Sequence, residues 1–180
     1  MKRPAFVAAL VLMFTVAVPV AGQQVTTLHP GKGGSPHVRA SWTIDGTNIS
    51  IDYGRPALKG RTVGKDVAPT GQIWRTGADE ATTLKIDKML MFGSVHLAPG
   101  TYTLYTLPGE KAWQLVINKQ TGQWGTEYDQ AQDVARIPMT VGKAPAATEP
   151  LTISIVDTPA GGTLHIDWGT TRASVNFSVM

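Results

Sequence analysis

The chain has 180 residues, with 16 Lys and Arg against 13 Asp and Glu, and its formal net charge is +3 at pH 7. This length suits one domain whose core is large enough to fold unaided. The absence of cysteine excludes disulfides and a lipid-modified N-terminal cysteine. Because the cations are scattered among nearly as many acids, the chain lacks the basic stripe that nucleic-acid binding needs.

The first 22 residues have the pattern of a secretory signal peptide. Lys2 and Arg3 precede an apolar stretch over residues 4–20, and small residues lead up to Gly22. This pattern predicts cleavage after Gly22. A retained membrane anchor is the weaker alternative, because the stretch is short for a spanning helix and contains Pro19. We expect an exported protein, periplasmic or extracellular, with no membrane span after cleavage.

Residues 23–36 are rich in Gln, Thr, Gly and Pro. Such a composition buries too little apolar surface to order itself, so it predicts a flexible leader. From residue 37 to residue 180 the sequence predicts a single domain, with no internal repeat.

The dominant pattern in that domain is the alternation of apolar and polar residues, which is typical of half-buried strands. Residues 38–44 and 49–53 alternate on either side of Asp45-Gly46, a pair that favours a tight hairpin turn. Similar runs occupy residues 84–86, 89–92, 95–97, 102–107, 113–117, 151–155, 164–168 and 173–179. Short, closely spaced strands leave no room for crossover helices. The sequence therefore predicts an all-β fold, an antiparallel β-sandwich of about eight to ten short strands, with at most one short helix near 128–136.

A polar, Gly-rich segment over residues 52–83 interrupts these strands. Its charged residues include the cations Arg55, Lys59, Arg61 and Arg75 and the acids Asp52, Asp66, Asp79 and Glu80. One interpretation is that forked Arg–carboxylate pairs pin the segment across a sheet edge. The other is that one or two cations stay unpaired in a cleft, where they would bind a carboxylate, phosphate or sulfate.

The five tryptophans divide by their surroundings. Trp42, Trp113 and Trp168 are in phase with the apolar face of their strands, which predicts core positions. Trp74 and Trp124 lie in polar segments next to glycine. These two could cover the edge of the sandwich or stack against a ligand such as a sugar ring.

Asp79-Glu80 is the only candidate catalytic pair. Glycoside hydrolysis uses two carboxyl groups facing one substrate. Neighbouring residues of an extended chain project to opposite faces, so these two share a site only if Gly77-Ala78 bends the backbone. The four histidines, His29, His37, His96 and His165, have no metal-ligand spacing, so we expect no metal site and no cofactor.

Several motifs together resemble a known family. They are Arg55-Pro56, Lys59-Gly60-Arg61, the stretch WRTGADEAT at 74–82, LAPGTY at 97–102 and Trp124-Gly125. Their order and spacing resemble the bacterial domain-of-unknown-function family 2911 from Ser35 to Val179. The resemblance implies an exported β-sandwich with its site in the polar segment, and it implies no reaction.

These observations favour a non-catalytic binding or scaffolding module whose ligand is polar, such as a glycan or an acidic small molecule. The candidate ligand-binding residues are Arg55, Lys59, Arg61, Trp74, Arg75, Asp79, Glu80 and Trp124. One alternative is a hydrolase that uses Glu80 or Asp79 as acid or base, with Arg75 stabilising developing charge. Another is a structural envelope protein that assembles through its strand edges.

Overall fold

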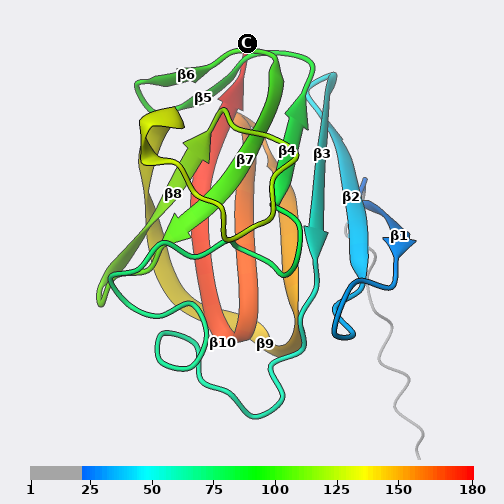
Figure 1. Cartoon of the computed structure of the whole chain (residues 1–180). Helices are drawn as coiled ribbons and strands as arrows, with labels where there is room; N and C mark the ends of the chain where they lie inside the picture. The colour runs from blue at the N-terminus through cyan, green and yellow to red at the C-terminus, as the bar shows by residue number, and fades with distance from the viewer. Residues whose placement is uncertain (1–21) are drawn as a thin grey trace, which may run out of the picture.

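The computed structural model describes residues 22–180, so the predicted signal peptide lies outside the described residues apart from Gly22 (Figure 1). Among the described residues, no helix has the length and apolar character needed to cross a membrane.

The described chain is built from strands. They are β1 (Gln24–His29), β2 (His37–Ile44), β3 (Thr47–Gly54), β4 (Thr83–Ile86), β5 (Leu90–Phe92), β6 (Val95–Leu97), β7 (Gly100–Leu107), β8 (Ala112–Asn118), β9 (Asp133–Thr158) and β10 (Gly161–Val179). All ten pair antiparallel in the order β1-β2-β3-β4-β7-β8-β9-β10-β5-β6. The predicted all-β antiparallel class is confirmed, with the strands joined in one continuous open sheet.

This sheet curls over so that its two halves enclose one core, with β7 and β8 lying in front of β9 and β10 in Figure 1. Ile49, Leu84, Leu104 and Leu115 from β3, β4, β7 and β8 line the same interior space as Phe92, Ile155, Leu164 and Phe177 from β5, β9 and β10. Burial of these apolar side chains is the main favourable contribution to folding.

The β2–β3 hairpin is formed as predicted. Ile44 pairs with Thr47 across the turn, and Asp45 and Gly46 both have positive φ, 47° and 70°. A two-residue turn with this backbone matches the twist of the two strands. The alternation in β2 buries Trp42 in the core, as expected.

The predicted flexible leader is corrected by the structure, because residues 24–29 form β1. All six residues of β1 are exposed, so side-chain burial does not order this strand. It is held by backbone pairing with β2, from Gln24 opposite Ser41 to His29 opposite His37.

The C-terminal strands also differ from the prediction. Helical structure near 128–136 is limited to a 3-10 turn, Gln130–Gln132, and β9 begins directly after it at Asp133. The two runs predicted at 164–168 and 173–179 belong to one strand, β10, and between them lies a bulge where Gly169 has φ 57° and the register with β9 shifts. The last two strands are therefore long, whereas short ones were predicted.

Candidate functional site

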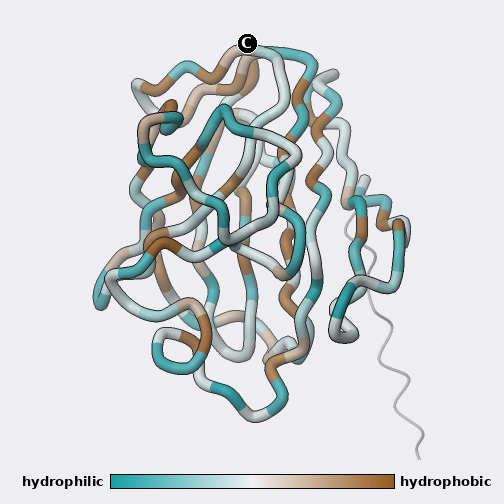
Figure 2. The backbone as a smooth tube through the Cα atoms, in the orientation of Figure 1, coloured by the Kyte–Doolittle hydropathy of each residue, from teal (hydrophilic) through white to brown (hydrophobic). Residues whose placement is uncertain are grey.

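The polar segment between β3 and β4 lines an open cleft of about 680 Å³. This loop lies at the lower end of the sheet in Figure 1, and Figure 2 shows that it mixes hydrophilic and hydrophobic stretches. The charged residues lining the cleft are the cations Lys32, Lys59, Arg61 and Arg75 and the acids Asp66 and Asp79. Its aromatic residues are Trp74, Tyr105, Tyr128 and Trp168.

Backbone hydrogen bonds hold the segment on two sides. Trp74 exchanges both of its backbone hydrogen bonds with Thr106 of β7, at 2.8 and 2.9 Å. Near its start, Leu58 N donates to Glu149 O of β9 at 2.8 Å. The buried Thr76 hydroxyl lies 3.2 Å from that of Thr106. The loop is therefore ordered by the sheet and makes a fixed wall of the cleft.

The cations of the segment do not pair with its acids. In the described part of the chain, none of Arg55, Lys59, Arg61 and Arg75 makes an ion pair. The carboxylate of Asp52 binds Arg39 of β2 at 2.6 Å, and that of Asp66 accepts from the backbone N–H of Thr62. Among residues 22–180, no forked pair therefore joins a cation of the segment to one of its acids, and the forked pair of Asp52 with Arg39 lies between β3 and β2.

Two of the arginines bind backbone carbonyls. Arg55 donates to Leu151 O and to the Thr152 hydroxyl, both at 3.1 Å, and it does not line the cleft. Arg61 donates to Ala57 O and Leu58 O and lies 5.8 Å above the ring of Trp168. Arg55 thus fastens the segment to β9, and Arg61 closes a local turn at the cleft edge.

Arg75 differs from both. It lines the cleft, and its guanidinium makes no hydrogen bond or ion pair within residues 22–180. The stem of its side chain is packed against Gly125, since a Cβ at that position would lie 2.8 Å from Arg75 Cδ. The aliphatic stem of Arg75 is therefore fixed, whereas its guanidinium remains available for hydrogen bonds. Lys59 also lines the cleft, and its backbone N–H, not its side chain, binds Glu149.

The two candidate tryptophans have different positions. Trp74 stacks on Trp168 and meets Trp113 edge-on, so its ring packs against the core. The same residue also lines the cleft. Trp124 lies outside the cleft lining, and Lys32 Nζ lies 4.9 Å from the centre of its ring.

Both tyrosines of the cleft have raised pKa values. Burial raises the pKa of Tyr128 to about 12, and the hydrogen bond it donates to Asp133 adds to this effect. Burial also raises the pKa of Tyr105, whose hydroxyl donates to Glu127 O. Like an ordinary tyrosine, both are neutral phenols near neutral pH.

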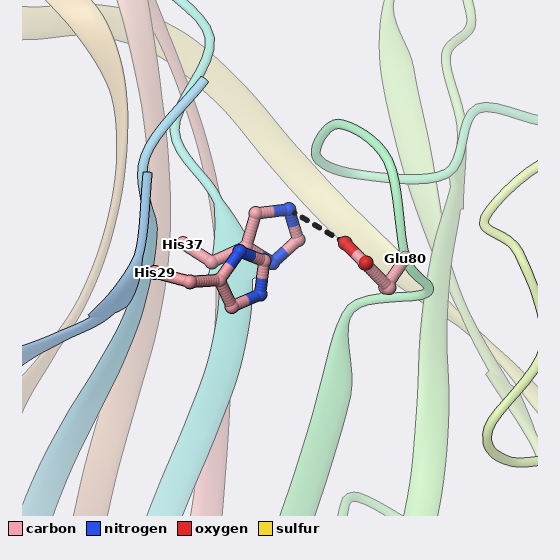
Figure 3. Close-up of side chains that lie close together, drawn as sticks. All are labelled: His29, His37 and Glu80. Carbon is pink, nitrogen blue, oxygen red and sulfur yellow. Dashed lines mark ion pairs between the residues drawn. The ribbon is translucent and has the colours of Figure 1, made fainter. Parts of the chain in front are cut away.

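Asp79 and Glu80 are brought together at one histidine. Asp79 has φ 61°, so the bend needed for neighbouring carboxylates to share a site lies at Asp79 itself. His37 Nε2 lies 3.0 Å from Glu80 Oε2 and 3.7 Å from Asp79 Oδ2, which also accepts the backbone N–H of Lys32 at 2.8 Å. Figure 3 shows Glu80 facing His37, with His29 beside it.

His37 and His29 were not among the predicted site residues. They are direct partners across the β1–β2 pair, and their rings stack with centroids 4.4 Å apart. The spacing of histidines along the chain could not reveal this. The Gly-rich connection from Gly31 to Gly34 was the usable signal, because it could have been interpreted as a hairpin loop that places His29 opposite His37.

No curated protein and no solved structure matches the chain. One family model, described as "Protein of unknown function (DUF2911)", matches residues 35–177 and so covers most of the described domain. The chain therefore belongs to the DUF2911 family.

Proposed function

We propose that this chain is an exported binding protein that holds an anionic small molecule, such as an acidic sugar, in the cleft beside Arg75. The observation that carries the proposal is the free guanidinium of Arg75, fixed along its stem and without a partner in the described part of the chain. Export rests on the N-terminal sequence, whose pattern is that of a signal peptide.

Charge supports an anionic ligand. Lys32, Lys59, Arg61 and Arg75 line the cleft against two acids, Asp66 and Asp79, so the cations are in excess. The planar guanidinium group binds carboxylates and phosphates through two parallel hydrogen bonds. A single ligand acid group opposite Arg75 would therefore be fixed in position and orientation.

Shape supports a ligand that also has an apolar face. The cleft volume of about 680 Å³ is within the range of small-molecule sites, which is roughly 300–1,000 Å³. Trp74, which is half-buried, offers aromatic surface in the cleft lining. Aromatic walls with a few polar groups suit the apolar face of a sugar ring.

Binding is better supported than hydrolysis. A glycosidase that used this pair would need Asp79 and Glu80 to face one substrate from two sides. Both carboxylates instead approach the same nitrogen of His37, and Glu80 does not line the cleft. Assembly through strand edges has in its favour the terminal positions of β1 and β6 in the sheet.

The test is a binding screen on the purified protein. Glucuronate and galacturonate oligosaccharides, sugar phosphates and dicarboxylates are compared with their neutral counterparts by thermal shift and then by calorimetry. We expect at least one anionic ligand to bind, and Arg75→Ala to weaken it at least tenfold. Arg39→Ala, which removes an exposed cation away from the cleft, is the matched control. Absence of anion binding, or equal binding by Arg75→Ala, would overturn the proposal.

Export is tested separately. The mass of the protein recovered from the periplasm or the medium of the native host should correspond to a chain that begins at Gln23. A full-length chain retained in the cytoplasm would refute export without affecting the binding proposal.

A further inference from the structure

We propose that His29, His37 and Glu80 form a binding site for a divalent transition-metal ion, where the β1–β2 hairpin meets the loop at residues 77–80. The site is separate from the Arg75 guanidinium, and its existence does not depend on anion binding in the cleft. Figure 3 shows the three side chains close together, with Glu80 facing His37 and His29 beside His37.

The spacing of the three groups is close to that of a metal site. One ligand atom from each of them lies within 4.8 Å of the other two. Two ligands at about 2.1 Å from a tetrahedral ion are separated by roughly 3.4 Å. His37 Nε2 and Glu80 Oε2 are 3.0 Å apart, which is already close to this spacing. Only His29 has to move appreciably.

The second observation in favour of a metal ion is the burial and hydrogen bonding of His37. Its side chain is 5% exposed, and its Nε2 is buried without a hydrogen-bond partner among the described residues. Glu80 Oε2 is near enough to this nitrogen but is not aligned for a hydrogen bond. A buried polar atom without a partner is costly. An ion between His37 and Glu80 would satisfy the nitrogen and the carboxylate together.

Nearby charge favours a cation at this position. Asp79 Oδ2 lies 3.7 Å from the same nitrogen of His37, which adds a second carboxylate beside Glu80. No side-chain ammonium or guanidinium lies within ion-pair distance of either carboxylate in the part of the chain that is described. Two carboxylates without a cationic side chain create a local negative potential that a divalent ion would neutralise.

One ring has to turn for both imidazoles to bind. The rings of His29 and His37 are stacked with their planes 15° apart, so their lone pairs do not converge on one point. His29 is exposed at the end of β1, and its Nδ1 accepts a long 3.2 Å hydrogen bond from Gly31 N. Rotation of His29 breaks this hydrogen bond and the ring stack, whereas His37 stays in its buried position.

The ligand set indicates which ions fit. Two imidazoles and one carboxylate suit Zn²⁺, Co²⁺, Ni²⁺ or Fe²⁺, whereas Ca²⁺ and Mg²⁺ prefer sites made of oxygen atoms. Three protein ligands leave at least one position for water or another ligand. A bound ion would also connect β1, β2 and the loop at 77–80, and so would fasten the exposed hairpin to the domain.

The experiment uses tag-free protein, since a histidine tag would compete for metal. Zn²⁺ binding is measured by calorimetry, and Co²⁺ binding by its visible absorption. We expect one equivalent to bind and both His29→Ala and Glu80→Gln to weaken binding at least tenfold. These two residues are exposed, so neither variant threatens folding. His96→Ala removes an exposed histidine elsewhere and should bind like the unmodified chain.

A second readout distinguishes this site from adventitious binding. Trypsin can cut after Lys32 in the exposed hairpin loop, and a bound ion that fastens the hairpin should slow this cut several-fold. His29→Ala should lose that protection. No binding by the unmodified protein, or equal binding by His29→Ala and Glu80→Gln, would overturn the proposal.

Discussion

Trp74 stacks on Trp168 with their ring centroids 5.5 Å apart and their planes at 11°. Trp113 meets Trp74 edge-on at 6.3 Å, so the loop that lines the cleft is anchored to the core through an aromatic cluster. Trp74 was expected either to cover an edge or to stack on a ligand. The structure shows that it covers the core and forms part of the cleft wall, so its loss should affect stability before it affects binding.

Trp74→Ala should therefore destabilise the domain. Truncation of a large aromatic residue in a core costs about 3–5 kcal/mol, and we expect the lower end because Trp74 is partly exposed. At about 2–4 °C per kcal/mol the melting temperature should fall by roughly 6–12 °C. Circular dichroism measures this change. A melting temperature within about 2 °C of the unmodified chain would show that the stack contributes little.

Arg75 and Arg55 should respond differently to truncation. Arg75→Ala removes no hydrogen bond among the described residues, so its stability should stay within about 0.5 kcal/mol. Arg55→Ala removes two hydrogen bonds from a charged donor to β9, which should cost about 1.5–3 kcal/mol. Urea unfolding of both variants provides the comparison. A larger loss for Arg75→Ala would mean that its side chain, through the stem packed against Gly125 or through the guanidinium, contributes to the fold.

Gly54 permits the close contact between the end of β3 and the site loop. A Cβ there would clash with the carbonyl of Ala78 and would lie 2.8 Å from His37 Nε2. Gly54→Ala should cost about 1–3 kcal/mol through overpacking and displace the loop at 77–80. Gly142→Ala is the control, because a Cβ at Gly142 meets nothing within 4 Å. Equal unfolding midpoints for the two variants would contradict this close approach.

Tyr128 should make the stability of the domain fall at alkaline pH. Its pKa is raised to about 12 in the folded state, whereas an unfolded tyrosine has a pKa near 10. The unfolded chain therefore loses the proton first. The stabilisation is complete below about pH 10 and is lost as the pH rises through about 12.

The measurement compares urea midpoints of the unmodified chain and Tyr128→Phe between roughly pH 9 and pH 11. The variant should lose less stability over this interval, although it starts about 1 kcal/mol lower because its hydrogen bonds are gone. The pKa values of Tyr53 and Tyr105 are also raised by burial, so the difference between the two proteins isolates Tyr128. If the urea midpoints of the two proteins fell by the same amount over this interval, the pKa of Tyr128 would not be raised in the folded state.

The parts of the fold that could be predicted are those with one buried face. In β2 and β3 the alternation of apolar and polar residues follows directly from a sheet with a core on one side. β1 has no buried face and is held by its backbone alone, so alternation could not reveal it. Residues 143–150 of β9 lack alternation for the same reason, since most of them are exposed.

The site residues that the sequence did not reveal, His29 and His37, depend on β1, the strand that was not predicted. Charge and composition located Arg75, Asp79 and Glu80 because those residues share one polar segment. His29 and His37 meet only because β1 pairs with β2. The grouping of the histidines with Glu80 then depends on the positive φ of Asp79, a conformation that no pattern of residue types specified.

The β9–β10 hairpin also bears on how the protein folds. Its two strands are joined by Pro159-Ala160 alone, so pairing can begin between neighbours and spread outward with little loop-closure entropy. β5 can join the end of β10 only after a long stretch of chain has closed, because Met91 pairs with Ser178. We expect the amide hydrogens of the hairpin's buried paired residues, Ile153, Ile155, Leu164 and Ile166, to exchange slowest. Those of β1, all of whose residues are exposed, should exchange fastest, so the strand that carries His29 would be the first to open in the native state.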